Sequence, residues 1–210
     1  MTPLNLLKKV REYLARQRRK LEPIVNADGL GEFIDTRSSL VAQTSLYGYI
    51  KTRAGTRFPD LFENEEFLQS INIAKWQIWA ACVSDLAVFS GGLLYREMPD
   101  ADRIRQVLQQ AIDPLLARTA QPSEAGEDFS TALEKLKIRI AGAPFTDAAT
   151  SENAFTVSPD ALVYWAPIVD ELKSLDESIV RYSIRFRWQA PRRELREALQ
   201  PARVLDSLDN

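Results

Sequence analysis

Apolar residues recur every three or four positions along most of the 210-residue chain, the spacing of amphipathic helices. Few segments show the strict alternation of a half-buried strand. We therefore predict an all-α fold, an irregular helical bundle of about six to eight helices in one domain, residues 1–210. The most regular apolar run comprises Ile104, Val107, Leu108, Ala111, Ile112, Leu115 and Leu116.

Capping residues, glycines and prolines predict where these helices begin and end. The expected helices are 3–21, 35–53, 64 onward with an end or a bend at the Gly91-Gly92 pair, 99–118 with a kink or restart at Pro114, 129–142, 158 onward with a break near Pro167, and a terminal helix from Pro191 to about 201. Loops are expected through Asn26 and Gly29, over 53–60 and over 119–128. Residues 143–157 are small and polar, which predicts a long irregular segment on a mobile surface.

The segment from Trp76 to Tyr95 is long enough to cross a bilayer, and Asp85 is its only ionised residue. It also contains polar and glycine residues that a membrane span rarely combines, including Gln77 and Ser84. Apolar residues fall on nearly every side of this helix. We therefore interpret it as a long buried central helix wrapped by the others.

Residues 1–21 form a basic amphipathic pattern, a helix that we consider detachable from the bundle. Seven bases stand against Glu12 in this segment, and its apolar residues share one face. Such a helix suits anionic lipid headgroups or an acidic protein groove, although its apolar face could equally complete the domain's own core. The candidate binding residues are Lys8, Lys9, Arg11, Arg16, Arg19 and Lys20.

The second basic segment lies near the carboxyl end, whereas the middle of the chain is acidic and the net charge is −2. Arg181, Arg185, Arg192 and Arg196 would share one stripe of a helix, with Trp188 beside them, if Pro191 bends the helix only slightly. Arginine planes next to an aromatic ring can hold phosphates and stack on bases. The interspersed glutamates favour instead a solvated face with ion pairs or a protein contact.

The strongest long-range pattern is a heptad seam with spacings of 4, 3, 4, 3 and 4. Such a seam packs against another helix, either within the bundle or on a second subunit, so we expect a protein partner and consider a homodimer. The seam consists of Ile168, Leu172, Leu175, Ile179, Tyr182 and Phe186.

Three polar residues, Asn72, Lys75 and Asp85, lie within the apolar central helix. Burial would shift the pKa of the lysine and the aspartate and could make them a base or an acid. The alternative, which we favour, is ion pairing with residues of the second or sixth helix.

The chain has no histidine and only one cysteine, Cys82, which excludes His-dependent triads, thiolate metal clusters and internal disulfides. We predict no cofactor and no metal, although an all-carboxylate cation site stays open. The charged amino-terminal segment does not resemble a secretory signal, so we expect a cytoplasmic protein, which could lie at the inner face of a membrane.

We expect a non-enzymatic adaptor, assembly factor or regulatory protein that acts through protein contacts. Two alternatives stay open: an enzyme using carboxylate or lysine chemistry on a small molecule held between helices, and a polyanion or nucleic-acid binder that uses the arginine stripe.

Overall fold

The computed structural model describes residues 22–119, 122–150 and 152–208. The predicted helix over residues 1–21, with its candidate binding residues, lies outside this part of the chain. The helices are α2 (Ala27–Ala54), α3 (Glu65–Glu97), α4 (Ala101–Arg118), α5 (Phe129–Gly142), α6 (Val157–Trp165), α7 (Asp170–Arg187), α8 (Gln189–Ala198) and α9 (Pro201–Asp206). Short 3-10 turns occupy Gly55–Arg57, Asp60–Glu63 and Glu152–Ala154. Strands are absent from the described residues, so the predicted all-α class is confirmed.

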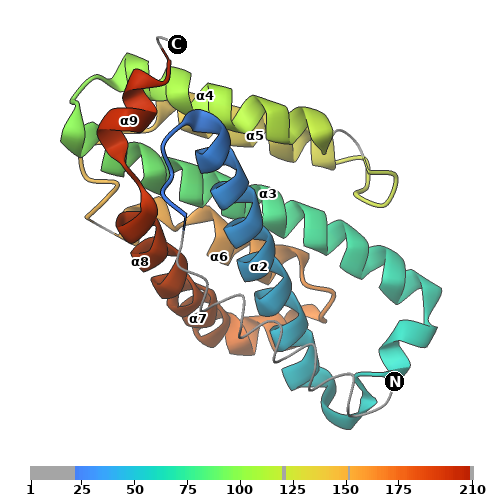
Figure 1. The fold of residues 1–210 in the computed structure, drawn as a ribbon. Helices are drawn as coiled ribbons and strands as arrows, with labels where there is room; N and C mark the ends of the chain where they lie inside the picture. The colour runs from blue at the N-terminus through green and yellow to red at the C-terminus, as the bar shows by residue number, and fades with distance from the viewer. Residues whose placement is uncertain (1–21, 120–121, 151, 209–210) are drawn as a thin grey trace.

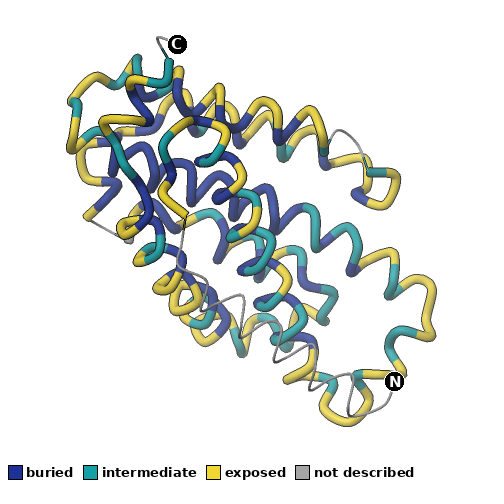
Figure 2. Tube along the Cα trace, viewed as in Figure 1, coloured by how far each residue is buried: buried dark blue, intermediate teal, exposed yellow. Residues whose placement is uncertain are grey.

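Helix α3 runs through the middle of the bundle, with α2, α4, α5, α6 and α9 packed around it (Figure 1). It is long and apolar enough to cross a membrane by length and composition, and 89% of its most apolar 18-residue window is buried inside the protein. The buried positions are concentrated toward the interior of the bundle, and the outer faces of the helices are exposed (Figure 2). The prediction of a long buried central helix is therefore confirmed.

The Gly91-Gly92 pair, where the sequence predicts an end or a bend, does not end α3, which continues to Glu97. A Cβ on Gly91 would lie 2.4 Å from the ring of Phe145, and one on Gly92 would lie 2.4 Å from the backbone nitrogen of Ala149. The glycines therefore let the 143–150 segment approach the helix closely. That segment is irregular as predicted, but it is not a mobile polar surface, because Phe145 and Ala149 are buried in the core.

Helix α2 begins eight residues before the predicted start, so the predicted loop around Gly29 is wrong. The Asn26 side chain accepts a hydrogen bond from the Gly29 nitrogen and caps the helix. Gly31 lies at a close crossing with α4, since a Cβ there would be 2.3 Å from the carbonyl oxygen of Ala111. This glycine serves helix packing and not a turn.

Two prolines do not end or restart a helix where the sequence allowed it. Helix α4 continues through Pro114, with the regular apolar run from Ile104 to Leu116 buried as predicted. Pro201 does not end the terminal helix but begins α9, whose Val204 and Leu205 are fully buried. Residues 201–206 are thus helical, and two of their side chains belong to the core.

The two ends of the described chain are joined by backbone hydrogen bonds. The nitrogen of Ile24 donates to the carbonyl of Ala198, and the nitrogen of Gln200 donates to the carbonyl of Ile24, each at 2.9 Å. Ion pairs between Arg37 and Glu194 and between Arg53 and Asp176 connect α2 with α8 and α7. These contacts set α2 antiparallel to α7 and α8 and fix how α7 lies on the bundle.

Candidate functional sites

The heptad seam lies mainly on the outside of α7. Leu175 is 74% exposed, Ile179 69%, Tyr182 70% and Phe186 57%. We call these four residues the α7 stripe. Ile168 and Leu172, at the other end of the seam, are half-buried.

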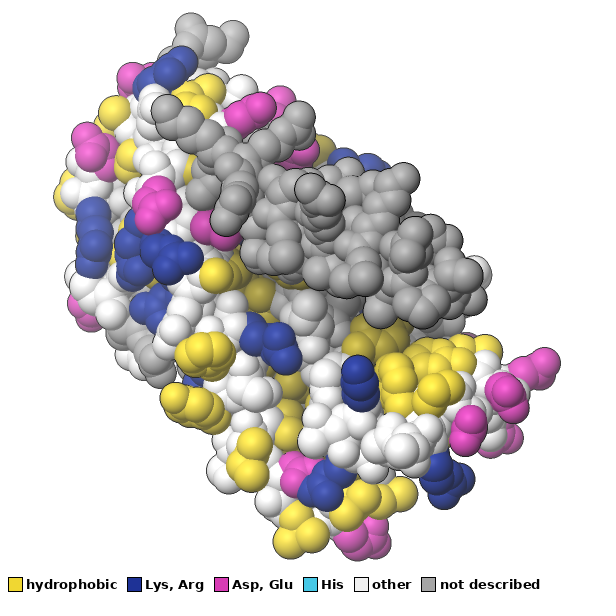
Figure 3. Space-filling view, turned by 60° about the horizontal axis from the view of Figure 1, so that its bottom comes forward, with side chains coloured by type: hydrophobic (Ala, Val, Ile, Leu, Met, Phe, Trp, Pro, Cys, Tyr) yellow, Lys and Arg dark blue, Asp and Glu magenta, His cyan; other side chains and the backbone are white. Residues whose placement is uncertain are grey.

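The opposite face of α7 packs on the bundle through Val180 and Ile184, both buried, and the chain then enters the core at Trp188. Because the core-facing positions differ from the heptad positions, the described helices do not cover the α7 stripe. Hydrophobic side chains reach the surface at several places on the face turned forward in Figure 3.

Charge is divided along α7. Its first half carries the acids Asp170, Glu171, Asp176 and Glu177 with Lys173, and its second half carries Arg181, Arg185 and Arg187. Arg181 pairs with Glu177 at 2.8 Å and with Asp160 of α6, which raises the pKa of the guanidinium. Glu171 and Arg185 are both exposed beside the stripe.

The predicted arginine stripe does not form one open surface with an aromatic neighbour. Trp188 is fully buried and donates its indole N–H to the Ser158 hydroxyl. The guanidinium of Arg192 lies 5.5 Å from the centre of the Phe89 ring, and that of Arg196 lies 5.0 Å from the same ring. These arginines therefore cover the bundle's own aromatic core, and burial lowers the pKa of Arg196.

Asp85 is fully buried and forms the centre of a polar cluster. Its carboxylate accepts hydrogen bonds from Arg139 of α5 at 2.6 Å and from the nitrogens of Val157 and Ser158 at 3.2 and 2.8 Å. Burial raises the pKa of Asp85, whereas the Arg139 charge and the Ser158 bonds oppose that shift. The carboxylate thus caps the amino end of α6 from another helix. The sequence predicted that the ion-pair partner of Asp85 would lie on the second or sixth helix, whereas the partner is Arg139 of α5.

Lys75 lies far along α3 from Asp85 and belongs to a separate, more exposed group. Its ammonium is 2.9 Å from Glu124 and 3.4 Å from the Asn72 side-chain oxygen. This hydrogen bond from Lys75 lowers the pKa of Glu124. The structure therefore does not bring Lys75 and Asp85 together in one catalytic group. The ion-pair partner of Lys75 is Glu124, in the loop before α5.

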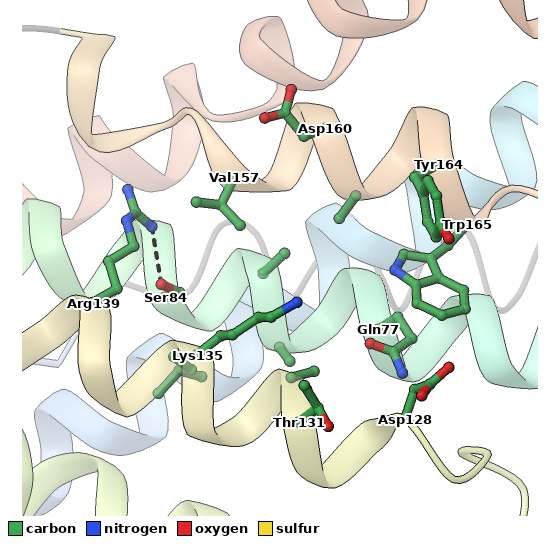
Figure 4. Close-up of a pocket in the computed structure, with 15 residues that line it drawn as sticks. Gln77, Ser84, Asp128, Thr131, Lys135, Arg139, Val157, Asp160, Tyr164 and Trp165 are labelled. Atoms are coloured by element: carbon green, nitrogen blue, oxygen red, sulfur yellow. Dashed lines mark hydrogen bonds between the residues drawn. The ribbon is translucent and has the colours of Figure 1, made fainter.

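A cleft of about 680 Å³ opens between α5 and α6 over the face of α3. Figure 4 shows Lys135 reaching across it from α5 and the Trp165 ring closing one end. Gln77 of α3 lines it and is only 4% exposed. Sequence reasoning missed this cleft because its floor consists of alanines and Ser84, which look like ordinary helix-packing residues. The available signal was Gln77, a polar residue inside an apolar helix.

Other chemistry is limited in the described residues. They contain no group of three or more acidic, cysteine or histidine side chains placed to hold a metal ion. Cys82 is fully buried, and burial raises the pKa of its thiol, which disfavours the reactive thiolate.

Comparison of the chain with protein-family models, curated proteins and solved structures gives no match.

Proposed function

We propose that this chain acts by protein–protein contact, as a helical adaptor, assembly factor or regulatory protein, and that the α7 stripe is its contact surface. The supporting observation is that four large apolar side chains at heptad spacing are each more than half exposed on one helix. Isolated apolar residues on a surface are ordinary, but a continuous helical seam of this kind is typical of an interface. We further propose that its occupant is a second copy of this chain.

Charge complementarity supports a second copy in antiparallel orientation. The first half of α7 is acidic and the second half basic, so two antiparallel α7 helices place opposite charges side by side. A parallel pair of α7 helices would instead place like charges side by side. An isologous, twofold-symmetric contact of this type closes on itself and yields a dimer.

The heptad register is compatible with this orientation. With the twofold axis near Glu177, Leu175 faces Ile179 of the partner subunit, Leu172 faces its Tyr182, and Ile168 faces its Phe186. Every seam residue then has an apolar counterpart. In the same register Glu171 flanks the seam opposite the partner's Arg185, so each dimer contains this ion pair twice.

The first experiment measures mass in solution by light scattering, since a dimer has twice the 23.8 kDa of the chain. Ile179→Glu inserts two charges into the dimer seam and should yield a monomer with unchanged helix content. The matched control is Ile138→Glu on α5, because Ile138 is also 69% exposed but lies off the stripe. A monomeric wild-type chain at high micromolar concentration, or equal behaviour of the two variants, would contradict the second-copy proposal.

A charge exchange tests the orientation. Glu171→Arg alone and Arg185→Glu alone should each weaken the dimer, because each creates like charges across the seam. The double exchange restores opposite charges and should restore the dimer. If the double variant is weaker than both single variants, the antiparallel register is wrong.

A further inference from the structure

The cleft between α5 and α6 combines an apolar floor with polar side chains along its walls. Figure 4 shows its labelled side chains arranged around an open space above α3. The floor is formed by Ala80, Ala81 and Ser84, and small side chains of the flanking helices, Ala132 and Ala161, keep it wide. A volume of about 680 Å³ lies within the range of small-molecule sites.

Gln77 is the observation that distinguishes this cleft from a packing defect. The residue is 96% buried, and its Nε2 has no hydrogen-bond partner in the part of the chain that the structure describes. In Figure 4 its amide lies at the end of the cleft lined by Trp165 and Asp128, with the nitrogen on the Asp128 side and the oxygen on the Lys135 side. A buried donor without a partner destabilises the folded protein, so a ligand acceptor placed there would recover a penalty that the protein already bears.

Lys135 adds a positive charge to the same cleft. Its side chain extends from α5 over the α3 floor in Figure 4, and the indole ring of Trp165 forms a wall at the same end as Gln77. Arg139 also lines the cleft, but its guanidinium is bonded to Ser84, Asp85 and the carbonyl of Ala154. Besides the Lys135 ammonium and the Gln77 amide, the cleft is lined by the hydroxyl side chains of Thr131 and Tyr164 and by the carboxylates of Asp128 and Asp160, of which Asp160 pairs with Arg181.

We infer that this cleft binds a small organic carboxylate with an apolar body. A carboxylate has two acceptor oxygens, one for the Lys135 ammonium and one for the Gln77 amide N–H. The apolar body lies on Ala80 and Ala81. A single negative charge fits better than a phosphate dianion, because one cation faces the ligand and Asp128 lies at the same cleft.

The direct test uses octanoate as the probe and full-length protein, with isothermal titration calorimetry as the readout. Octanol and octylamine, which share the same chain, replace the anion by a neutral and a cationic group. Octanoate should bind at least about tenfold more tightly than either analogue, because only the anion gains the charge-assisted hydrogen bond. Equal binding of the three, or no octanoate binding at millimolar concentration, would overturn the inference.

Two variants locate the site. Lys135→Met should weaken octanoate binding by about tenfold or more, whereas Lys137→Met, two residues along the same helix and outside the cleft, should leave it unchanged. Ala81→Leu fills the floor and should abolish binding while the circular dichroism spectrum and melting temperature confirm folding. Octanoate binding that is equal in Lys135→Met and Lys137→Met would refute the proposed site.

An amide-specific readout tests the role of Gln77. In ¹H–¹⁵N spectra, the side-chain NH₂ pair that disappears in Gln77→Met identifies this residue. Octanoate should shift that pair at a concentration that matches the calorimetric affinity. Saturation with octanoate without any shift would contradict a hydrogen bond from Gln77. None of these measurements depends on dimer formation through the α7 stripe.

Discussion

The buried pair of Asp85 and Arg139 provides the sharpest prediction about stability. The Asp85 carboxylate is fully buried and accepts bonds from the Arg139 guanidinium and from the backbone nitrogens of Val157 and Ser158. Asp85→Asn keeps the size of the side chain but removes its charge. Its amide nitrogen must also turn toward at least one of the donors that the carboxylate now satisfies.

The expected cost is about 3 kcal/mol or more, because removing one member of a buried ion pair leaves the other charge without compensation. For a chain of this size each kcal/mol lowers the melting temperature by about 2–4 °C, so the predicted fall is about 6–12 °C. Urea denaturation followed by far-ultraviolet circular dichroism measures the free energy of unfolding. Trp188 bonds to Ser158 at the amino end of α6, so tryptophan fluorescence should report the same loss.

The matched control is Asp170→Asn at the start of α7. The Asp170 side chain is 95% exposed and its contact with Lys173 is 3.6 Å long, so the variant should stay within about 0.5 kcal/mol of the wild type. Arg139→Met should cost as much as Asp85→Asn, and the double variant should cost less than the sum of the two. If Asp85→Asn and Asp170→Asn have the same unfolding free energy, the cluster does not hold α6 on α3 and α5 as we argue.

Two further predictions concern α2. Gly31→Ala should lower the free energy of unfolding in urea by about 1–3 kcal/mol, because its methyl group would press on the Ala111 carbonyl. The control Gly48→Ala should be neutral or stabilising, because the new methyl group meets only a flexible guanidinium. Equal losses of stability in the two variants would refute the close crossing of α2 and α4. Burial and the Asp176 carboxylate raise the pKa of Tyr49 to about 12. The folded state therefore favours the neutral hydroxyl, and this contribution to folding stability is fully present below the unfolded pKa of about 10. It is lost as pH rises toward 12. Over that window the wild type should lose about 2–3 kcal/mol more than Tyr49→Phe, as measured by urea midpoints, and parallel pH profiles would contradict the shift.

Much of the fold was predictable because local patterns and tertiary packing agree. The run from Ile104 to Leu116 gives one apolar face, and all of it is buried in α4. The central helix was predictable because apolar residues surround it. The start of α2 was not, since Gly29 and Gly31 resemble loop residues unless the neighbouring α4 backbone is known.

The candidate sites were predictable only in part. The heptad spacing identified the seam on α7, but the spacing cannot distinguish an inner face from an outer one, and the exposure of Leu175 and Ile179 required the structure. Asp85 stood out as a charge within an apolar run, yet its partner, Arg139, is 54 residues away. Gln77 and Lys135 have no sequence relationship that would place them at one cleft.

The helical class, the central helix and the positions of its few polar residues follow from the amino-acid pattern alone, because they depend on the three-to-four-residue spacing of side chains along one helix. Tertiary structure decided which glycines lie at helix crossings, which face of α7 points outward and where α5 and α6 leave a cleft over α3. Those outcomes depend on the mutual orientation of helices, which is set by close packing between residues distant in the chain.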